Sequence, residues 1–243
     1  KVPEWMQGLM PTLVIPFTSS FIAGLIMYYI IGTPINWVAS QITGYLGGLD
    51  RSQLLFYGAI IGILSSIDYG GAINKVVFAF VFTLFSEQIY EPITVLILAS
   101  MVTPFGLTMA YFIGKVFGKN IFNKQEVETL KTAFPMGVCQ ITEGCFPIVL
   151  NDLFKNVIAT GVGGAVGGAL SMLWGADSHI PASGMFAVFT MTRPWAFIGA
   201  LLLGSLATAI TILILRPQVD PEAEVVIQEV EEDELSWDDL KIS

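Results

Sequence analysis

Charged side chains are scarce in this sequence. Asp, Glu, Lys and Arg together make up 13% of the 243 residues, whereas apolar residues make up 54% and the mean hydropathy is +0.71. A soluble domain carries roughly 25% charged residues. Because a charged side chain at mid-bilayer costs at least ~2.5–3.5 kcal/mol, the deficit indicates a chain surrounded mostly by lipid.

An excess of positive charge is also lacking, since the net charge is −9. Residues 1–216 hold ten basic and ten acidic side chains, and residues 217–243 hold ten acidic residues and one lysine. A neutral apolar body with an acidic tail argues against a nucleic-acid partner. We therefore expect a membrane domain over 1–216 and an acidic tail over 217–243 that is disordered and cytoplasmic.

Cysteine is limited to Cys139 and Cys145, which lie six positions apart beside apolar residues. This spacing is not that of a zinc or disulfide framework, and we expect two buried thiols, although a single disulfide between them stays open. We also expect no metal site and no cofactor. No signal peptide is visible. The abrupt start at Lys1 is typical of a piece of a longer polypeptide.

Long apolar runs predict membrane-spanning helices. The first run, Leu9–Ile31, has no charge over its whole length and is long enough to cross ~30 Å of hydrocarbon. The stretch Lys115–Lys131, with four lysines and two glutamates, is expected to be an aqueous loop that faces the cytoplasm. The other expected apolar segments are Gln53–Phe85, Pro92–Val116, Val157–Trp174 and Pro194–Leu215. The first of these is too long for one span and could form two spans or two half-helices that meet at an unwound centre.

Polar, Gly- and Pro-containing breaks interrupt these segments at 65–75, 101–106, 140–147 and 175–184. Residues Thr132–Leu150, with Pro135 and Pro147 around Thr142-Glu143-Gly144, are predicted to form a re-entrant hairpin. Irregular backbone at membrane depth is tolerated only where protein buries it or where it lines a wet cavity. The expected fold is an all-α polytopic membrane protein with transmembrane helices, broken helices and re-entrant hairpins.

The side chains at the breaks are mainly hydroxyls, amides and carboxylates, which suits a neutral polyhydroxylated ligand. Broken helices supply such groups at the binding sites of transporters. Asp68 and Lys75 are more often a structural pair than ligands, whereas Glu143 has no cation nearby in sequence and favours a functional role. Two readings of His179 stay open, a loop histidine and a substrate or proton contact. The candidate ligands are Asp68, Asn74, Thr103, Gln140, Thr142, Glu143 and His179, beside further polar residues at Asn151, Asp152 and Ser178.

Glycines recur four apart in the segment Val157–Trp174. Gly163 is followed by Gly167, and Gly164 by Gly168. Small residues at this spacing let the backbones of membrane helices approach closely. We expect a packing seam without a substrate contact.

Four strings occur in an order that resembles the membrane component, enzyme IIC, of the fructose-family phosphotransferase-system permeases. The resemblance covers roughly residues 3–215 and is specific because order and spacing agree, although each string alone would be weak. The strings are Ser66-Ile67-Asp68-Tyr69-Gly70-Gly71-Ala72-Ile73-Asn74-Lys75, Tyr90-Glu91-Pro92, Met101-Val102-Thr103-Pro104-Phe105-Gly106 and Gln140-Ile141-Thr142-Glu143-Gly144-Cys145-Phe146-Pro147.

The resemblance implies a permease in a bacterial cytoplasmic membrane. It implies that the protein binds sugar from outside, presents it to a phosphorylated IIB partner, and forms a homodimer. A IIA protein acts upstream of IIB. The resemblance also implies that Thr142 and Glu143 contact the sugar, with Glu143 acting on the hydroxyl that attacks phosphorus. The chain has no cysteine in a soluble phospho-acceptor context and would need IIB for phosphoryl transfer. The resemblance further implies that this chain is the C-terminal part of the membrane domain, because several spans normally precede it.

One departure from the family concerns the sugar. The family commonly has a Pro-His-Gly-Gly string, where this chain reads Pro181-Ala182-Ser183-Gly184 with His179 placed earlier. The sugar is therefore left open between fructose and a derivative such as mannosyl-glycerate.

Two other classes of function stay open at this point. The chain could be an ion-gradient-driven secondary transporter with Asp68 and Glu143 as ion carriers. It could also be a structural membrane subunit whose polar breaks bind another chain. Uptake that depends on an ion gradient would identify the first, and failure of a purified complex to bind any sugar would identify the second.

Overall fold

A computed structural model of the chain describes residues 15–26 and 51–219. Throughout these residues the regular structure is helical, and this confirms the predicted all-α class. Three helices are long and apolar enough to cross a membrane: α5 (Glu91–Val116), α8 (Leu153–Trp174) and α9 (Pro194–Leu215). The predicted segment Pro194–Leu215 agrees with α9 at both ends.

Shorter helices complete the described part. The predicted run Leu9–Ile31 is described only over α1, and the acidic tail lies outside the described residues from position 220 onward. The shorter elements are α1 (Ile15–Ile26), α3 (Arg51–Ser66), α4 (Ala72–Ser86), α6 (Lys124–Val138), the 3-10 helix η4 (Glu143–Cys145), α7 (Phe146–Asn151) and the 3-10 helix η5 (Gly184–Thr190).

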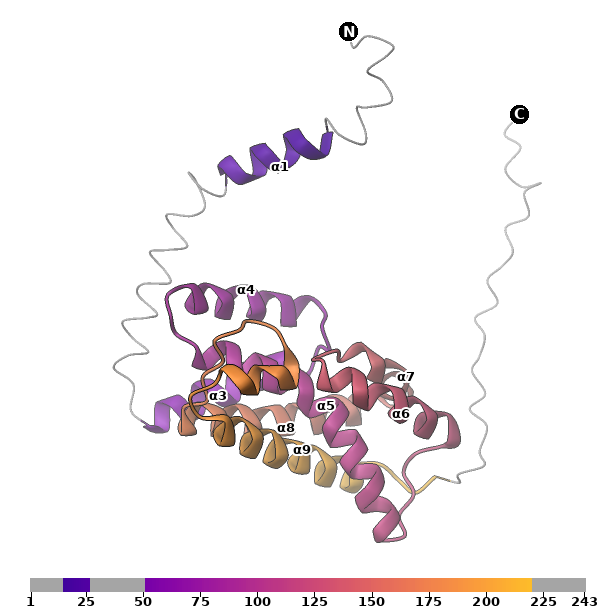
Figure 1. The fold of residues 1–243 in the computed structure, drawn as a ribbon. Helices are drawn as coiled ribbons and strands as arrows, with labels where there is room; N and C mark the ends of the chain where they lie inside the picture. Colours follow the sequence, from indigo (N-terminus) through magenta and orange to yellow (C-terminus); the bar gives the residue numbers. More distant parts are fainter. Residues whose placement is uncertain (1–14, 27–50, 220–243) are drawn as a thin grey trace, which may run out of the picture.

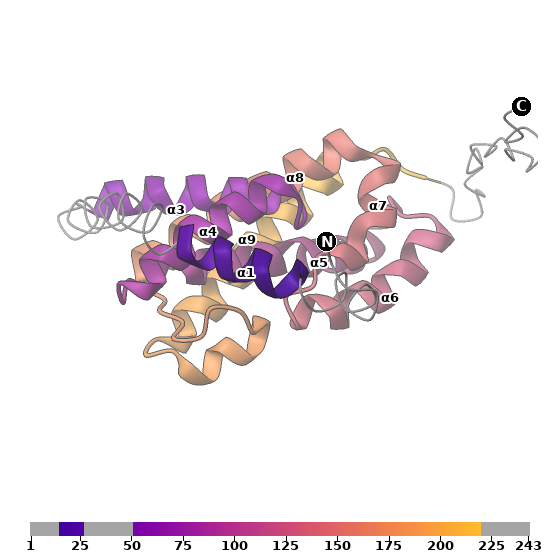
Figure 2. The same cartoon turned by 90° about the horizontal axis from the view of Figure 1, so that it is seen from above.

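Helix α5 is the centre of the fold, since every residue from Pro92 to Pro104 is buried. Helices α8 and α9 lie beside it in Figures 1 and 2, and α8 runs antiparallel to the other two. The end of α5 therefore meets the end of α9, where Val219 N donates to Asn120 O at 2.8 Å. At the opposite end, Arg193 Nη1 donates to Trp174 O at 3.2 Å.

These contacts define two ends of the helix group. We call the end where α5 and α9 finish and α6 and α8 begin the lysine end, because four lysines lie there. We call the other the tryptophan end, because the rings of Trp174 and Trp195 lie 5.9 Å apart there. The four lysines are Lys115, Lys119, Lys124 and Lys155.

The glycine seam of α8 packs as predicted. A Cβ added to Gly62 in α3 would lie 2.0 Å from Gly164 O, and one added to Gly58 would lie 2.3 Å from Gly168 O. These separations leave no room for a side chain, so the backbones of α3 and α8 are in direct contact. On another side of α8, a Cβ on Gly163 would lie 2.6 Å from Gly204 O in α9.

Three predictions of local structure are wrong. Helix α5 is unbroken across 101–106, because Pro104 is accommodated inside it. The expected aqueous loop is largely helical: α5 continues to Val116, and α6 begins at Lys124 after an Asn123–Glu126 capping box. Cys139 is exposed at the end of α6, although Cys145 is buried as expected and both thiols are free.

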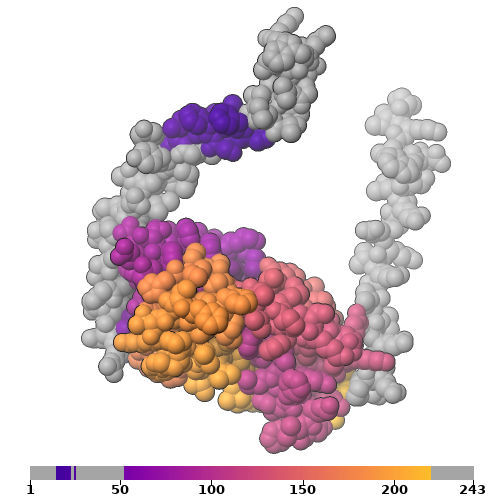
Figure 3. All heavy atoms as spheres, in the orientation of Figure 1, coloured from indigo at the N-terminus to yellow at the C-terminus, as the bar shows by residue number. Residues whose placement is uncertain are grey.

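The connection between α8 and α9, which contains η5, folds back over the helix group. On the face shown in Figure 3 it lies next to the segment of α6 and α7. Two hydrogen bonds join them: Gln140 Oε1 accepts from Ser183 N and from Gly184 N, each at 3.1 Å. The predicted breaks at 140–147 and 175–184 therefore meet in space.

Candidate functional site

The break between α3 and α4 is a tight turn fixed by its own side chains. Asp68 Oδ2 accepts from Ile73 N at 2.6 Å and from Asn74 N at 3.2 Å, so this carboxylate satisfies the free N–H groups at the start of α4. Asn74 Nδ2 donates to Ser65 O at 2.8 Å and thereby joins the two helices.

Asp68 and Lys75 do not form the expected structural pair among the described residues. Lys75 Nζ instead donates to Gly70 O at 2.9 Å. Gly70 has φ +95°, a conformation that glycine adopts readily and other residues adopt rarely. Lys75 and the Asp68 cap thus hold the same turn through different atoms.

Tyr69 attaches this turn to α8. It has φ +46°, its side chain is buried, and its hydroxyl lies 2.9 Å from Thr160 Oγ1. Thr160 Oγ1 in turn lies 3.4 Å from Ser66 O, and it donates to Asn156 O of its own helix at 2.9 Å. Sequence reasoning missed Thr160, because a threonine in an apolar helix carries no signal of a partner ninety-one positions away.

The predicted hairpin is formed by α6, the η4 turn and α7. It begins earlier in the sequence than expected, at Lys124 rather than Thr132. Gln140, with φ +67°, ends the first arm and bonds to the connection between α8 and α9. Thr142 is buried and its hydroxyl donates to Ser100 O of α5 at 3.4 Å.

Pro104 supplies the point on α5 where the hairpin docks. Proline has no N–H, so Ser100 O lacks the helical donor four residues ahead and is free to accept from Thr142. A Cβ added to Gly137 of α6 would lie 2.2 Å from Pro104 Cγ, which shows direct packing of α6 on the proline ring. The proline that predicted a broken helix instead marks a docking position on an intact one.

Glu143 is the residue at which the break at 140–147 meets the break at 65–75. Its Oε1 lies 2.9 Å from the position that a Cβ on Gly70 would occupy. The side chain is exposed, and no residue within 15–26 and 51–219 forms a hydrogen bond or ion pair with it. The structure therefore brings an available carboxylate from the hairpin against the turn that Asp68 and Asn74 fix.

The height of this meeting point follows from its helical contacts. Ser100 lies nine positions into α5, about 14 Å from the tryptophan end at ~1.5 Å per residue. Thr160 lies seven positions into α8, about 10 Å from the lysine end. Glu143 and the Asp68 turn therefore lie at an intermediate height along the long helices, away from both ends.

Two predicted ligands are not brought to Glu143. Thr103 is fully buried inside α5, and its hydroxyl has no hydrogen-bond partner among the described residues. His179 packs on Tyr90 with ring centroids 4.3 Å apart, and its Nε2 lies 3.5 Å from Asp177 Oδ2. The structure thus places His179 in a loop cluster at the tryptophan end.

Asp177 organises that loop. Its Oδ1 accepts from Thr192 N at 3.0 Å and from Arg193 N at 3.3 Å. Partial burial raises the pKa of Asp177, but hydrogen bonds from Thr192 and Arg193 and the proximity of His179 outweigh it, so the pKa lies below its ordinary value. The charged carboxylate therefore stabilises the connection that returns the chain to α9.

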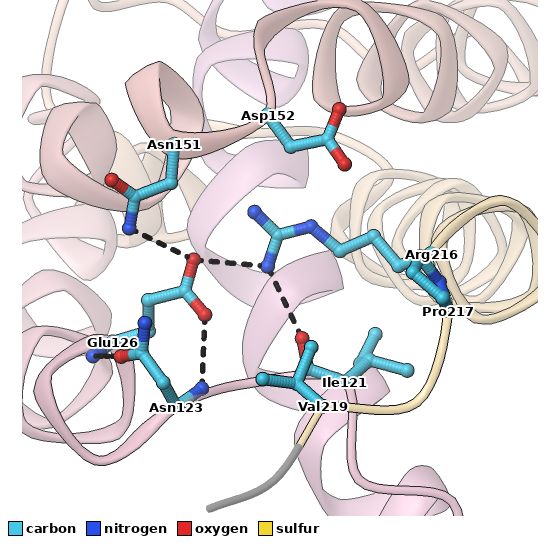
Figure 4. A pocket seen from close by; sticks show the side chains of 8 residues that line it. All are labelled: Ile121, Asn123, Glu126, Asn151, Asp152, Arg216, Pro217 and Val219. Atoms are coloured by element: carbon cyan, nitrogen blue, oxygen red, sulfur yellow. Dashed lines mark hydrogen bonds and ion pairs between the residues drawn. The ribbon is translucent and has the colours of Figure 1, made fainter. Parts of the chain in front are cut away.

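A second polar cluster, at the lysine end, was missed by sequence reasoning. Arg216 Nη1 lies 3.0 Å from Glu126 Oε1, and both side chains are about 5% exposed. Figure 4 shows that Arg216 also donates to Ile121 O and that Asn151 Nδ2 donates to Glu126 Oε1. A further hydrogen bond runs from Arg216 Nη2 to Ile148 O at 3.1 Å. The cluster borders a cavity of about 250 Å³ and attaches both arms of the hairpin to the end of α9.

The Asn-x-x-Glu spacing at Asn123 and Glu126 was the sequence signal available for this cluster. It marks a helix start, and the capping box is formed by hydrogen bonds of 2.8 and 3.1 Å. The partner, Arg216, is ninety positions away and could not be assigned from spacing. Within the described residues, no group of His, Cys, Asp and Glu side chains is arranged to hold a metal ion.

Fold and site together define a membrane protein in which the breaks of apolar helices meet around an accessible carboxylate. No family model matches the chain, and no solved structure matches it. Curated relatives do. A fructose-specific EIIB'BC component of the phosphotransferase system from Haemophilus influenzae is 32% identical over 222 residues, covering 91% of this chain and 39% of the relative.

Two further relatives consist of fewer components. The fructose-specific EIIC component of Haloferax volcanii is 32% identical and aligns with 90% of this chain and 58% of the relative. The fructose permease IIC component of Bacillus amyloliquefaciens is 29% identical, with 90% and 70% covered. Over about nine tenths of its length the chain is similar to the fructose-specific EIIC components of the phosphotransferase system. It spans about two fifths of the length of the first of these relatives.

Proposed function

We propose that this chain is the sugar-translocating part of a phosphotransferase-system permease that carries fructose or a fructose-type derivative. The names of its relatives supply the class of substrate. The observation that carries the assignment is the Glu143 carboxylate, which has no partner in the described part of the chain and lies against the Gly70 turn at an intermediate height. A hydrated solute needs hydrogen-bonding groups at that depth.

Glu143 acts on a sugar hydroxyl in this proposal. The carboxylate accepts the hydroxyl hydrogen, the hydroxyl oxygen forms a bond to phosphorus, and the bond from phosphorus to the cysteine sulfur of a IIB partner breaks. The proton passes to Glu143. Phosphoryl transfer depends mainly on positioning and charge, and one placed base contributes typically ~10²–10⁴-fold.

The neighbouring predicted ligands position the two turns rather than contact the sugar. Thr142 and Gln140 hold the hairpin turn against α5 and the α8–α9 connection. Asp68 and Asn74 hold the facing turn. We assign direct sugar contact to Glu143 and to backbone groups of these two turns, whereas Thr103 and His179 remain outside the site in this conformation.

The orientation and assembly belong to the same proposal. Four lysines at one end favour a cytoplasmic location for that end in a multi-pass protein of the bacterial cytoplasmic membrane, because positive residues are retained on the cytoplasmic side. The acidic tail follows α9 at this end and is therefore cytoplasmic too. Phosphorylated IIB, with IIA acting upstream of it, docks at this end. The membrane component forms a homodimer.

Coupled uptake tests the proposal. Sugar accumulation and phosphoenolpyruvate-dependent phosphorylation are measured in cells that contain the intact permease with Glu143→Gln. Glu128→Gln is the matched control, since Glu128 is an exposed glutamate that pairs with Lys131 on α6. We expect loss of both activities in Glu143→Gln only. Unchanged phosphorylation would remove the assigned role, and uptake that follows an ion gradient without a phosphoryl donor would indicate a secondary transporter.

A further inference from the structure

Three lysines at the lysine end have no carboxylate partner among the described residues. Lys115 and Lys124 are exposed, and Lys119 donates to Leu213 O, a neutral acceptor. We call these three the free lysine face. The remaining cations there are neutralised in pairs: Lys155 with Asp152 and Arg216 with Glu126.

The chain leaves α9 beside the loop that carries Lys119. Arg216 is held by Glu126, Ile121 and Ile148, and Val219 N donates to Asn120 O at 2.8 Å. Asn120 follows Lys119 directly and precedes Lys124 by four positions. The segment that continues beyond Val219 therefore starts at the loop that joins Lys119 to Lys124.

The segment that continues is the most acidic in the chain. Residues 220–243 contain all ten acidic residues of the tail and one lysine. Fully extended, a chain of that length spans several tens of ångströms, at ~3.3–3.6 Å per residue, so it can reach every residue of the face. Because it is tethered, its effective concentration at the face is about millimolar or higher.

The surface beside the face also suits this segment. Val116 and Phe117 are each 81% exposed and lie between Lys115 and Lys119 in sequence. The tail contains apolar residues among its acidic ones, at Val225-Val226-Ile227 and at Leu235 and Trp237. Both charge and apolar surface are therefore complementary.

We propose that residues 220–243 bind the free lysine face of the same chain, with carboxylates paired to Lys115, Lys119 and Lys124. The occupied face is then closed to other anionic surfaces. If the proposed function is right, a phosphorylated partner protein has to displace the tail before it docks. That consequence rests on the proposed function, whereas the binding itself does not.

The distance between tail and face tests the proposal in the intact protein. Nitroxide labels are attached at Ser236→Cys and Gln125→Cys in a Cys139→Ser background, where Cys145 remains buried. The protein is held in nanodiscs of zwitterionic lipid, so that anionic headgroups do not compete. Pulsed electron paramagnetic resonance then gives the label separation at ionic strengths of about 0.01 M and 1 M, where charges act over ~30 Å and ~3 Å.

We expect a short separation at low salt, and a roughly tenfold fall in the ratio of bound to unbound tail at high salt. This estimate corresponds to three contacts of about 0.5 kcal/mol each, the size of ordinary exposed ion pairs. Lys115→Gln/Lys124→Gln should shift the low-salt separation in the same direction, while Lys115→Arg/Lys124→Arg, which keeps the charge, should not. Separations that respond neither to salt nor to the lysines would overturn the proposal. Since sugar uptake does not enter this measurement, its outcome is independent of the permease assignment.

Discussion

The hydroxyl of Thr142 donates to the carbonyl oxygen of Ser100 at 3.4 Å, the oxygen that Pro104 leaves without a helical donor. This bond joins the turn that carries Glu143 to the most buried helix of the fold. Gly137 packs against the same proline ring. One proline thus provides both a free acceptor and a flat packing surface for the hairpin.

The first prediction concerns Thr142. Thr142→Val removes the donor and leaves the buried Ser100 carbonyl unsatisfied, so we expect a loss of about 1–3 kcal/mol in the free energy of unfolding. Thr142→Ser keeps the donor and should lose much less. Chemical unfolding of the purified protein measures both. Thr129→Val is the control, because Thr129 bonds to its own helix, and an equal loss there would contradict the prediction.

A double-mutant cycle with Pro104→Ala gives the second prediction. The new backbone N–H at position 104 can donate to Ser100 O, so the carbonyl no longer depends on Thr142. In that background Thr142→Val should cost about 1 kcal/mol less than in the wild-type background, which is a coupling of the size found for residues in contact. Additive losses in the unfolding measurement would show that Pro104 does not act through this carbonyl.

The third prediction concerns the buried pair of Arg216 and Glu126. Arg216→Gln leaves Glu126 buried without its cation, and removing one partner of such a pair costs about 3–5 kcal/mol. The double variant Glu126→Gln/Arg216→Gln should be more stable than Arg216→Gln alone, because no charge is left unpaired. Thermal unfolding ranks the variants, and a double variant at least as unstable as the single one would contradict the charge argument.

Acidity supplies the fourth prediction. The pKa of Asp177 is lowered in the folded protein, so its stabilising contribution is complete above the ordinary value of about 3.9 and is lost as pH falls through the lower folded value. Asp177→Asn should therefore be less stable than wild type at neutral pH, and the gap should narrow in strong acid. Proteolysis of the α8–α9 connection at a series of pH values measures this difference in stability between Asp177→Asn and wild type. Glu87→Gln, at an exposed carboxylate, should show no such gap.

Local pattern predicted much of the fold. An uncharged run bounded by Arg193-Pro194 and Arg216-Pro217 predicted both ends of α9. Pro194 suits the first position of a helix, and Pro217 cannot continue one. The glycines of α8 gave a close helix contact, although not its partner α3. The break predicted at Pro104 is wrong, and the carbonyl that this proline leaves without a helical donor accepts a hydrogen bond from elsewhere in the chain. The donor, Thr142, lies thirty-eight positions away in the sequence.

The candidate site was predictable in its parts and not in its assembly. Polar residues at helix breaks singled out Asp68, Asn74, Gln140, Thr142 and Glu143, and the structure brings these two turns together. The sequence cannot show that the Asp68 carboxylate accepts hydrogen bonds from the start of α4, because a capping aspartate and a free ligand have the same pattern in the sequence. The cluster of Arg216 and Glu126 was missed for a different reason, because its two charged members lie ninety positions apart in the sequence.

Equilibrium sugar binding to the intact permease tests the central claim, that Glu143 receives a sugar hydroxyl, most directly. Radiolabelled fructose is titrated against wild type, Glu143→Gln and the control Glu128→Gln, without a phosphoryl donor. A charge-assisted hydrogen bond of about 1.5–3 kcal/mol predicts a roughly ten- to hundredfold weaker Kd for Glu143→Gln alone. Equal affinity of all three proteins for a sugar that the wild type binds would contradict the account.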